Sequence, residues 1–126
     1  MSQLKQYILV IDDEPGVREV TAEILREAEV QTLEASSGPA GIELFRNHSD
    51  QIMLVLLDYY MPDMNGIEVL EKLWYIDPSV PVLLFSGYSQ SSIMRNCERD
   101  NAIGFLQKPY TINELLFAVR QHLKRW

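Results

Sequence analysis

The sequence predicts a doubly wound α/β fold, with five parallel strands in one sheet and five helices packed over its two faces. Short apolar runs alternate with longer amphipathic segments along the 126 residues, which is typical of repeated strand and helix units. Four of the apolar runs end abruptly at polar residues. At 126 residues and with no visible linker, we expect residues 1–126 to form a single domain, and the absence of an internal repeat or low-complexity tract favours a single sheet.

The predicted strands are short apolar runs of similar length. Residues 7–11 are continuously apolar, as expected for a strand that is covered on both faces. Residues 52–57 form the most apolar run and are expected at the centre of the sheet. The other strands are predicted at residues 30–35, 80–85 and 103–106.

The helices are predicted from start signals and from apolar residues at spacings of three and four. Pro15 opens the first helix, and Ser37 is the expected N-cap of the second, which runs toward Asn47. The third follows a loop at 59–66, the fourth spans 89–100, and the fifth begins near Ile112. The fourth is weakly amphipathic and is expected to be the least stable. The apolar positions of the other helices are Val17, Val20, Ile24, Leu25 and Ala28; Ile42, Leu44 and Phe45; Ile67, Leu70, Leu73 and Trp74; and Ile112, Leu115, Leu116, Val119 and Leu123.

Right-handed crossovers leave few topologies for such a sheet, and we predict the flavodoxin-like strand order 2-1-3-4-5. Ligands bind such sheets beyond the carboxyl ends of the strands, where the strand order reverses. Here the reversal lies between the first and third strands. The polar residues that end the apolar runs are expected to meet at this edge: Asp12 and Asp13, Asp58, Ser86, and Lys108 with Pro109.

Three carboxylates, a hydroxyl and an ammonium group suit a divalent cation and a transferred phosphoryl group. Clustered carboxylates repel one another unless a cation is bound, and Mg²⁺ prefers carboxylate and phosphate oxygens. Asp58 is the candidate nucleophile that forms an acyl phosphate. Lys108 is the candidate counter-ion of one phosphoryl oxygen, and the Ser86 hydroxyl is a candidate hydrogen-bond donor to another.

Each of these residues also has a simpler explanation. Asp12, Asp13 and Glu14 would also suit ordinary solvent-facing positions at a helix N-terminus, where negative charge is favourable. Lys108 alone would suit a surface salt bridge, and Ser86 alone a turn before Gly87. Because all of them lie at strand ends, we favour the functional interpretation.

Composition narrows the function classes. The net charge of −7 argues against direct nucleic-acid binding, and a basic partner or a metal is the better expectation. The only cysteine, Cys97, has no partner for an internal disulfide, so we expect a cytosolic protein. No segment approaches the roughly 20 apolar residues of a membrane span, and we expect no membrane insertion.

Four segments give the chain a resemblance to the receiver domains of two-component response regulators. They are VIDDEP at 10–15, LDYYMPDMNG at 57–66, FSG at 85–87 and GFLQKPY at 104–110. The segments come in the family's order with family-like intervals, and the resemblance covers essentially the whole chain. It suits a stand-alone regulator or a receiver domain of a hybrid sensor histidine kinase.

The resemblance implies a phosphoacceptor that assists its own phosphorylation and dephosphorylation but is otherwise not an enzyme. Asp58 would accept a phosphoryl group from a phosphohistidine of a sensor histidine kinase or a histidine phosphotransfer protein. Asp13, Asp58 and the backbone carbonyl of Tyr60 would bind Mg²⁺ directly, and Asp12 would act through a water molecule. The Lys108-Pro109 peptide bond would be cis.

The resemblance also implies a switch. Ser86 and Phe105 match the family's switch pair, which would change the surface formed by the fourth helix, the fifth strand and the fifth helix. That surface would control a downstream protein or an attached domain, and the last two helices are a candidate homodimer surface. Tyr60 and Tyr88 lie where the family tunes the access of water. Two bulky rings there predict slow self-dephosphorylation, unless both simply lie on the surface.

Three other functions remain as alternatives. A Mg²⁺-dependent phosphatase with an aspartyl nucleophile would need an acidic residue two positions after Asp58, where this chain has Tyr60. A nucleotide-binding module would need a Gly-rich or Ser/Thr-rich loop after the first strand, where Asp12 and Asp13 would repel phosphate. A vestigial receiver would act as a constitutive protein-interaction module.

Overall fold

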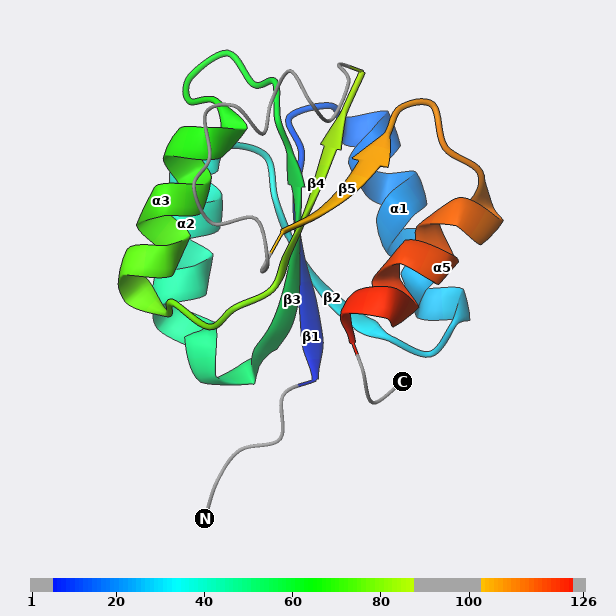
Figure 1. The fold of residues 1–126 in the computed structure, drawn as a ribbon, viewed down its shortest axis with the longest axis horizontal. Coiled ribbons are helices and arrows are strands. Elements are labelled where there is room, and N and C mark those ends of the chain that lie inside the picture. Colours follow the sequence, from blue (N-terminus) through cyan, green and yellow to red (C-terminus); the bar gives the residue numbers. More distant parts are fainter. Residues whose placement is uncertain (1–5, 88–102, 124–126) are drawn as a thin grey trace.

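The computed structural model describes residues 6–87 and 103–123, and it shows a five-stranded parallel sheet between two layers of helices (Figure 1). The sheet order is β2-β1-β3-β4-β5, so the predicted fold class and strand order are confirmed. The strands are β1 (Tyr7–Ile11), β2 (Gln31–Ala35), β3 (Ile52–Asp58), β4 (Val82–Ser86) and β5 (Ile103–Gln107).

Helices α1 (Pro15–Glu27) and α5 (Ile112–His122) cover one face of the sheet, and α2 (Gly38–His48) and α3 (Gly66–Ile76) cover the other (Figure 1). A short 3₁₀ helix, η1 (Ser49–Gln51), precedes β3. Four of the five predicted helices are therefore confirmed. The fifth prediction, a helix at 89–100 with Cys97, lies outside the described residues, and so does Tyr88. Within the described ranges, no helix is long and apolar enough to cross a membrane.

The core lies on both faces of the sheet because successive residues of a strand point to opposite sides. In β1, Leu9 and Ile11 pack into the cluster that includes residues of α2 and α3. Ile8 and Val10 pack into the cluster that includes residues of α1 and α5. β3 is bonded to β1 on one side and β4 on the other, as predicted for the most apolar run.

The observed strands differ from the predicted ones at their ends. β3, β4 and β5 each extend one residue further at their carboxyl ends, so Asp58 and Ser86 are the last residues of β3 and β4. β4 begins only at Val82, after Pro81, which has no N–H to donate to a ladder. β2 begins at Gln31 because Glu29 adopts a left-handed conformation (φ 66°) after α1.

The helix starts are defined by side-chain caps. Ser37 accepts a hydrogen bond from the Ala40 amide (3.1 Å), which confirms the predicted N-cap of α2. Two capping boxes were not predicted, although their spacing is present in the sequence. They join Asn65 to Glu68 at α3 and Thr111 to Glu114 at α5.

The buried face of α1 is rotated from the predicted one. Thr21 is buried, whereas Val20 is exposed. The Thr21 hydroxyl lies 3.1 Å from the Tyr110 hydroxyl, so a hydrogen bond between them compensates for burying this polar group. This bond ties α1 to the segment that follows Lys108.

Candidate functional site

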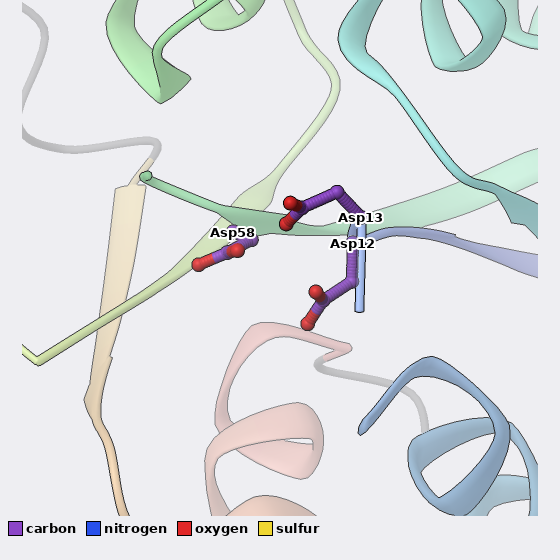
Figure 2. Close-up of side chains that lie close together, drawn as sticks. All are labelled: Asp12, Asp13 and Asp58. Carbon is purple, nitrogen blue, oxygen red and sulfur yellow. The ribbon is translucent and has the colours of Figure 1, made fainter. Parts of the chain in front are cut away.

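Asp12, Asp13 and Asp58 meet at the carboxyl ends of β1 and β3 (Figure 2). One carboxylate oxygen from each side chain lies within 4.8 Å of those of the other two. Asp12 and Asp58 are buried, and Asp13 is half-buried. The alternative that Asp12 simply faces solvent is therefore wrong.

The register of the sheet brings these aspartates together. Ile11 of β1 pairs with Leu57 of β3, so Asp12 and Asp58, the residues that follow them, leave the two strands side by side. The last four apolar residues before each aspartate, at 8–11 and 54–57, are fully buried and hold the ends of both strands in the core. The predicted switch point between the first and third strands is thus the place where the acidic residues gather.

Lys108 enters the same site from the segment after β5. Its Nζ lies 3.3 Å from Asp58 Oδ1, 3.5 Å from Asp12 Oδ2 and 3.9 Å from Glu14 Oε1. The Lys108 amide donates to the Ser86 carbonyl (2.7 Å), and the Lys108-Pro109 peptide bond is cis, as expected. The Lys108 side chain is only 23% exposed, and its partners Asp12 and Asp58 are buried. These contacts are therefore not surface salt bridges.

The electrostatics of the site follow from burial and crowding. Burial and the neighbouring Asp12 carboxylate raise the pKa of Asp58 to about 6, against the opposing effect of Lys108. Burial also raises the pKa of Asp12, although the hydrogen bond from the Glu14 amide and the charge of Lys108 oppose this shift. For Lys108, burial lowers the pKa, but Asp12 and Asp58 outweigh that effect and leave the pKa above its ordinary value.

The donor set fits Mg²⁺. Among the described residues, Asp12 Oδ2 is a buried side-chain oxygen that makes no hydrogen bond. Lys108 Nζ lies 3.5 Å away and offsets part of its charge, but a buried oxygen without a hydrogen bond is still costly until a metal ion or a water molecule satisfies it. The three clustered carboxylates supply the hard oxygen ligands that Mg²⁺ prefers. The exposed side of the site, near Asp13, leaves access to solvent.

Ser86 and Phe105 lie on neighbouring strands. Ser86 is buried at the end of β4 and pairs with Gln107, so it is a strand residue and not a turn residue. Phe105 pairs with Leu84, which lies two positions before Ser86. Because side chains alternate along a strand, Ser86 and Phe105 belong to the same face of the sheet. Phe105 is partly buried against the cluster on that face.

Tyr60 is 69% exposed at the rim of the site. Its effect on water access stays a prediction, as does that of Tyr88. Arg18 was not predicted as a site residue, but its side chain reaches the carbonyl of Asp12 from α1. An arginine on an amphipathic helix gives no sequence signal that separates this contact from ordinary solvation.

The charge of Asp58 is expected to destabilise the metal-free protein. The rise of its pKa from 3.8 to about 6 corresponds to about 3 kcal/mol at about 1.4 kcal/mol per pH unit. The folded protein takes up this proton between pH 6 and 4, where the unfolded chain does not. Asp58→Asn should therefore raise the free energy of unfolding at pH 8 by up to about 3 kcal/mol, and the advantage should fall as the pH drops below 6.

Urea denaturation in EDTA from pH 5 to 8 measures this effect. The matched control is Asp63→Asn, because Asp63 is an exposed carboxylate on the loop that follows β3. Its substitution should change stability by less than about 0.5 kcal/mol. Equal stability of Asp58→Asn and wild type at pH 8 would contradict the burial and repulsion inferred for Asp58.

Comparison with known proteins finds a family model and similar proteins that match most of the chain. The family model of the response regulator receiver domain matches residues 8–120. Sporulation initiation phosphotransferase F of Bacillus subtilis is 28% identical, with 95% of each chain covered. Sensor kinase CckA of Brucella abortus is 29% identical over 94% of this chain but only 12% of its own length. The crystal structure of the receiver domain from hybrid histidine kinase CckA has a TM-score of 0.80 at 31% identity, covering 93% of this chain and 98% of that one.

Proposed function

The chain belongs to the response regulator receiver domain family, and on this premise we propose that it is a phosphoacceptor switch whose acceptor is Asp58. One observation carries the choice of Asp58. It is a buried carboxylate at the end of the central strand, with Lys108 Nζ at 3.3 Å and two further aspartates beside it. A nucleophile in this setting has a counter-charge ready for the group that it accepts.

In the proposed transfer, an Asp58 carboxylate oxygen forms a bond to phosphorus while the P–N bond of a phosphohistidine breaks. The imidazole leaves with the electron pair of that bond. Lys108 pairs with one phosphoryl oxygen, and the Ser86 hydroxyl donates a hydrogen bond to another. Bound Mg²⁺ would supply neutralisation of the charge that develops on the phosphoryl oxygens.

We propose that Asp13, Asp58 and the backbone carbonyl of Tyr60 hold Mg²⁺ directly, and that Asp12 acts through a water molecule. Two observations support this assignment: Oδ2 of Asp12 makes no hydrogen bond, although Lys108 Nζ lies 3.5 Å away, and the three carboxylates are closely spaced. Tyr60 is proposed to slow hydrolysis of the acyl phosphate together with Tyr88. Turnover by the chain itself would be limited to its own phosphorylation and dephosphorylation.

The proposed donor is a sensor histidine kinase or a histidine phosphotransfer protein, because the similar proteins include a sensor kinase and a phosphotransferase. An apolar groove of about 620 Å³ lies beside Lys108 and offers a donor protein a contact surface next to Asp58. Its walls are Gly16, Val17, Val20, Thr21 and Ile24 of α1, and Pro109, Tyr110 and Ile112.

The proposed output passes through Ser86 and Phe105 to the surface that includes β5 and α5. Phe117 of α5 is a large exposed apolar side chain, which supports contact with a downstream protein or an attached domain. The chain spans 95% of the length of phosphotransferase F but only 12% of the length of sensor kinase CckA. The activity of such a longer kinase is therefore not assigned to this chain. The cytosolic location, the homodimer and the absence of nucleic-acid binding stay predictions.

Intact-mass spectrometry after incubation with acetyl phosphate tests the proposed switch. We expect one phosphoryl adduct in the presence of Mg²⁺, removed by hydroxylamine as an acyl phosphate should be, and little adduct in EDTA. A folded protein that binds Mg²⁺ but gains no adduct would refute the phosphoacceptor and favour a vestigial receiver that signals by binding alone.

A further inference from the structure

Arg18 of α1 contacts the backbone of the acidic site instead of its carboxylates. Its Nη1 donates a hydrogen bond to the carbonyl oxygen of Asp12 (2.8 Å). Its Nε lies 3.6 Å from Glu34 Oε1 on β2, and the Arg18 side chain is only 16% exposed. The guanidinium group therefore connects three elements: the end of β1, α1 and β2.

The contact acts on the peptide unit that joins Asp12 to Asp13. This unit is planar, so a hydrogen bond to the Asp12 carbonyl restricts the orientation of the whole plane and with it the direction in which Asp13 leaves the strand. Two other bonds hold Asp12: its amide donates to the Ala35 carbonyl (3.1 Å), and its Oδ1 accepts from the Glu14 amide (3.0 Å). Among these contacts, Arg18 supplies the side-chain donor from outside the loop.

The hydrogen bond of Arg18 favours Mg²⁺ binding, whereas its positive charge opposes it. A positive group next to a cation site disfavours Mg²⁺ by electrostatic repulsion. Glu34 offsets part of that charge, because its carboxylate lies between Arg18 and Arg26, with Arg26 Nη1 at 3.8 Å from Oε2. If Arg18 is replaced by a neutral residue, loss of the hydrogen bond should therefore weaken Mg²⁺ binding, whereas loss of the positive charge should strengthen it.

We propose that Arg18, held by Glu34, is a positioning residue that orients the Asp12-Asp13 peptide for Mg²⁺ binding. This inference rests on the proposed Mg²⁺ site. Arg18 touches neither the ion nor the phosphoryl group in this assignment. It acts as the supporting partner of a ligand loop, and loss of such partners typically weakens metal binding by about 10- to 100-fold.

Calorimetric titration of the metal-free protein with Mg²⁺ tests the proposal. Arg18→Met should raise the Kd about 10- to 100-fold, even though it removes a positive charge near the site. A tighter Kd would show that only the charge matters, and an unchanged Kd that Arg18 merely supports the fold. Either result overturns the proposal.

Arg18→Lys keeps the charge but loses the planar fork that reaches both Asp12 and Glu34. If Arg18 positions the peptide, this variant should also have a higher Kd for Mg²⁺. If only its charge matters, the Kd should not change. This variant also keeps the test decisive if Arg18→Met does not fold, which circular dichroism and urea denaturation would show.

The matched control is Arg26→Met. Arg26 lies on the same helix and also pairs with Glu34, but its side chain is 56% exposed, and no contact with Asp12 is observed within the described residues. Its replacement should leave the Kd within about twofold of wild type. Failure of the wild-type protein to bind Mg²⁺ would refute the proposed metal site itself. Wild-type binding with an equal Kd for Arg18→Met would refute only the role of Arg18.

Discussion

Asp58→Asn is expected to lose the Mg²⁺-dependent phosphoryl adduct, with a rate of formation at least ~10³-fold below that of wild type. An amide has no anionic oxygen to attack phosphorus, while its size preserves the packing at the end of β3. The same variant should be more stable than wild type without metal, because it removes a buried charge next to Asp12. Loss of the adduct together with higher stability separates a chemical defect from a folding defect.

Intact-mass spectrometry with acetyl phosphate measures the loss, and Asp63→Asn is the control. Asp63 is exposed on the loop after β3, so its variant should form the adduct at the wild-type rate. An adduct of normal yield on Asp58→Asn would place the acceptor elsewhere. Asp13 would be the next candidate, because its carboxylate is the more accessible member of the cluster.

Lys108→Met is expected to slow adduct formation by about 10²-fold, the typical loss when one group that stabilises transition-state charge is removed. It should also lower the free energy of unfolding at pH 8 without metal by about 2 kcal/mol, less than the roughly 3–5 kcal/mol of a fully buried pair, because the Lys108 side chain is 23% exposed. Lys108 Nζ is within 3.5 Å of both Asp12 and Asp58, and its removal leaves two buried carboxylates without their shared cation. Added Mg²⁺ should recover much of that stability, because it supplies a replacement charge.

Urea denaturation with and without Mg²⁺, and mass spectrometry over time, measure the two effects separately. Lys72→Met is the matched control, because Lys72 is an exposed lysine of α3 that takes no part in the contacts of the acidic site. An unchanged rate of phosphorylation in Lys108→Met would remove Lys108 from the proposed transfer and leave it a structural role. An unchanged stability would contradict the inference that Lys108 stabilises the two buried aspartates.

The strands and the acidic cluster were predictable because their signals are local. A continuous apolar run marks a strand buried on both faces, and the strand ends at the last residue of that run or directly after it. Asp12 and Asp58 each follow such a run, so the parallel topology alone was enough to place them together. The N-cap Ser37 was predictable for the same reason, since a cap depends on its own turn of helix.

The buried face of α1 and the role of Arg18 were not predictable from the sequence. Val20 and Thr21 are neighbours, and only the packing of α1 against the sheet decides which of them is buried. Thr21 is the buried one, and its hydroxyl pairs with Tyr110, which is 89 residues away. Arg18 likewise finds its partners in two segments, directly after β1 and on β2, which precede and follow its own helix.

The sequence by itself determined the order of the elements, the edge of the sheet that carries the chemistry and the residue types gathered there. It could do so because the hydrophobic pattern sets which segments become strands and, to within about two residues, where each strand begins and ends. The tertiary structure decided how strongly those residues interact. Burial gives Asp58 its raised pKa. Lys108, after β5, pairs with Asp58 at the end of β3 and with Asp12 after β1. Arg18 of α1 donates a hydrogen bond to the peptide that joins Asp12 to Asp13. These properties depend on distances between segments far apart in the chain, and only the packed sheet and helices determine them.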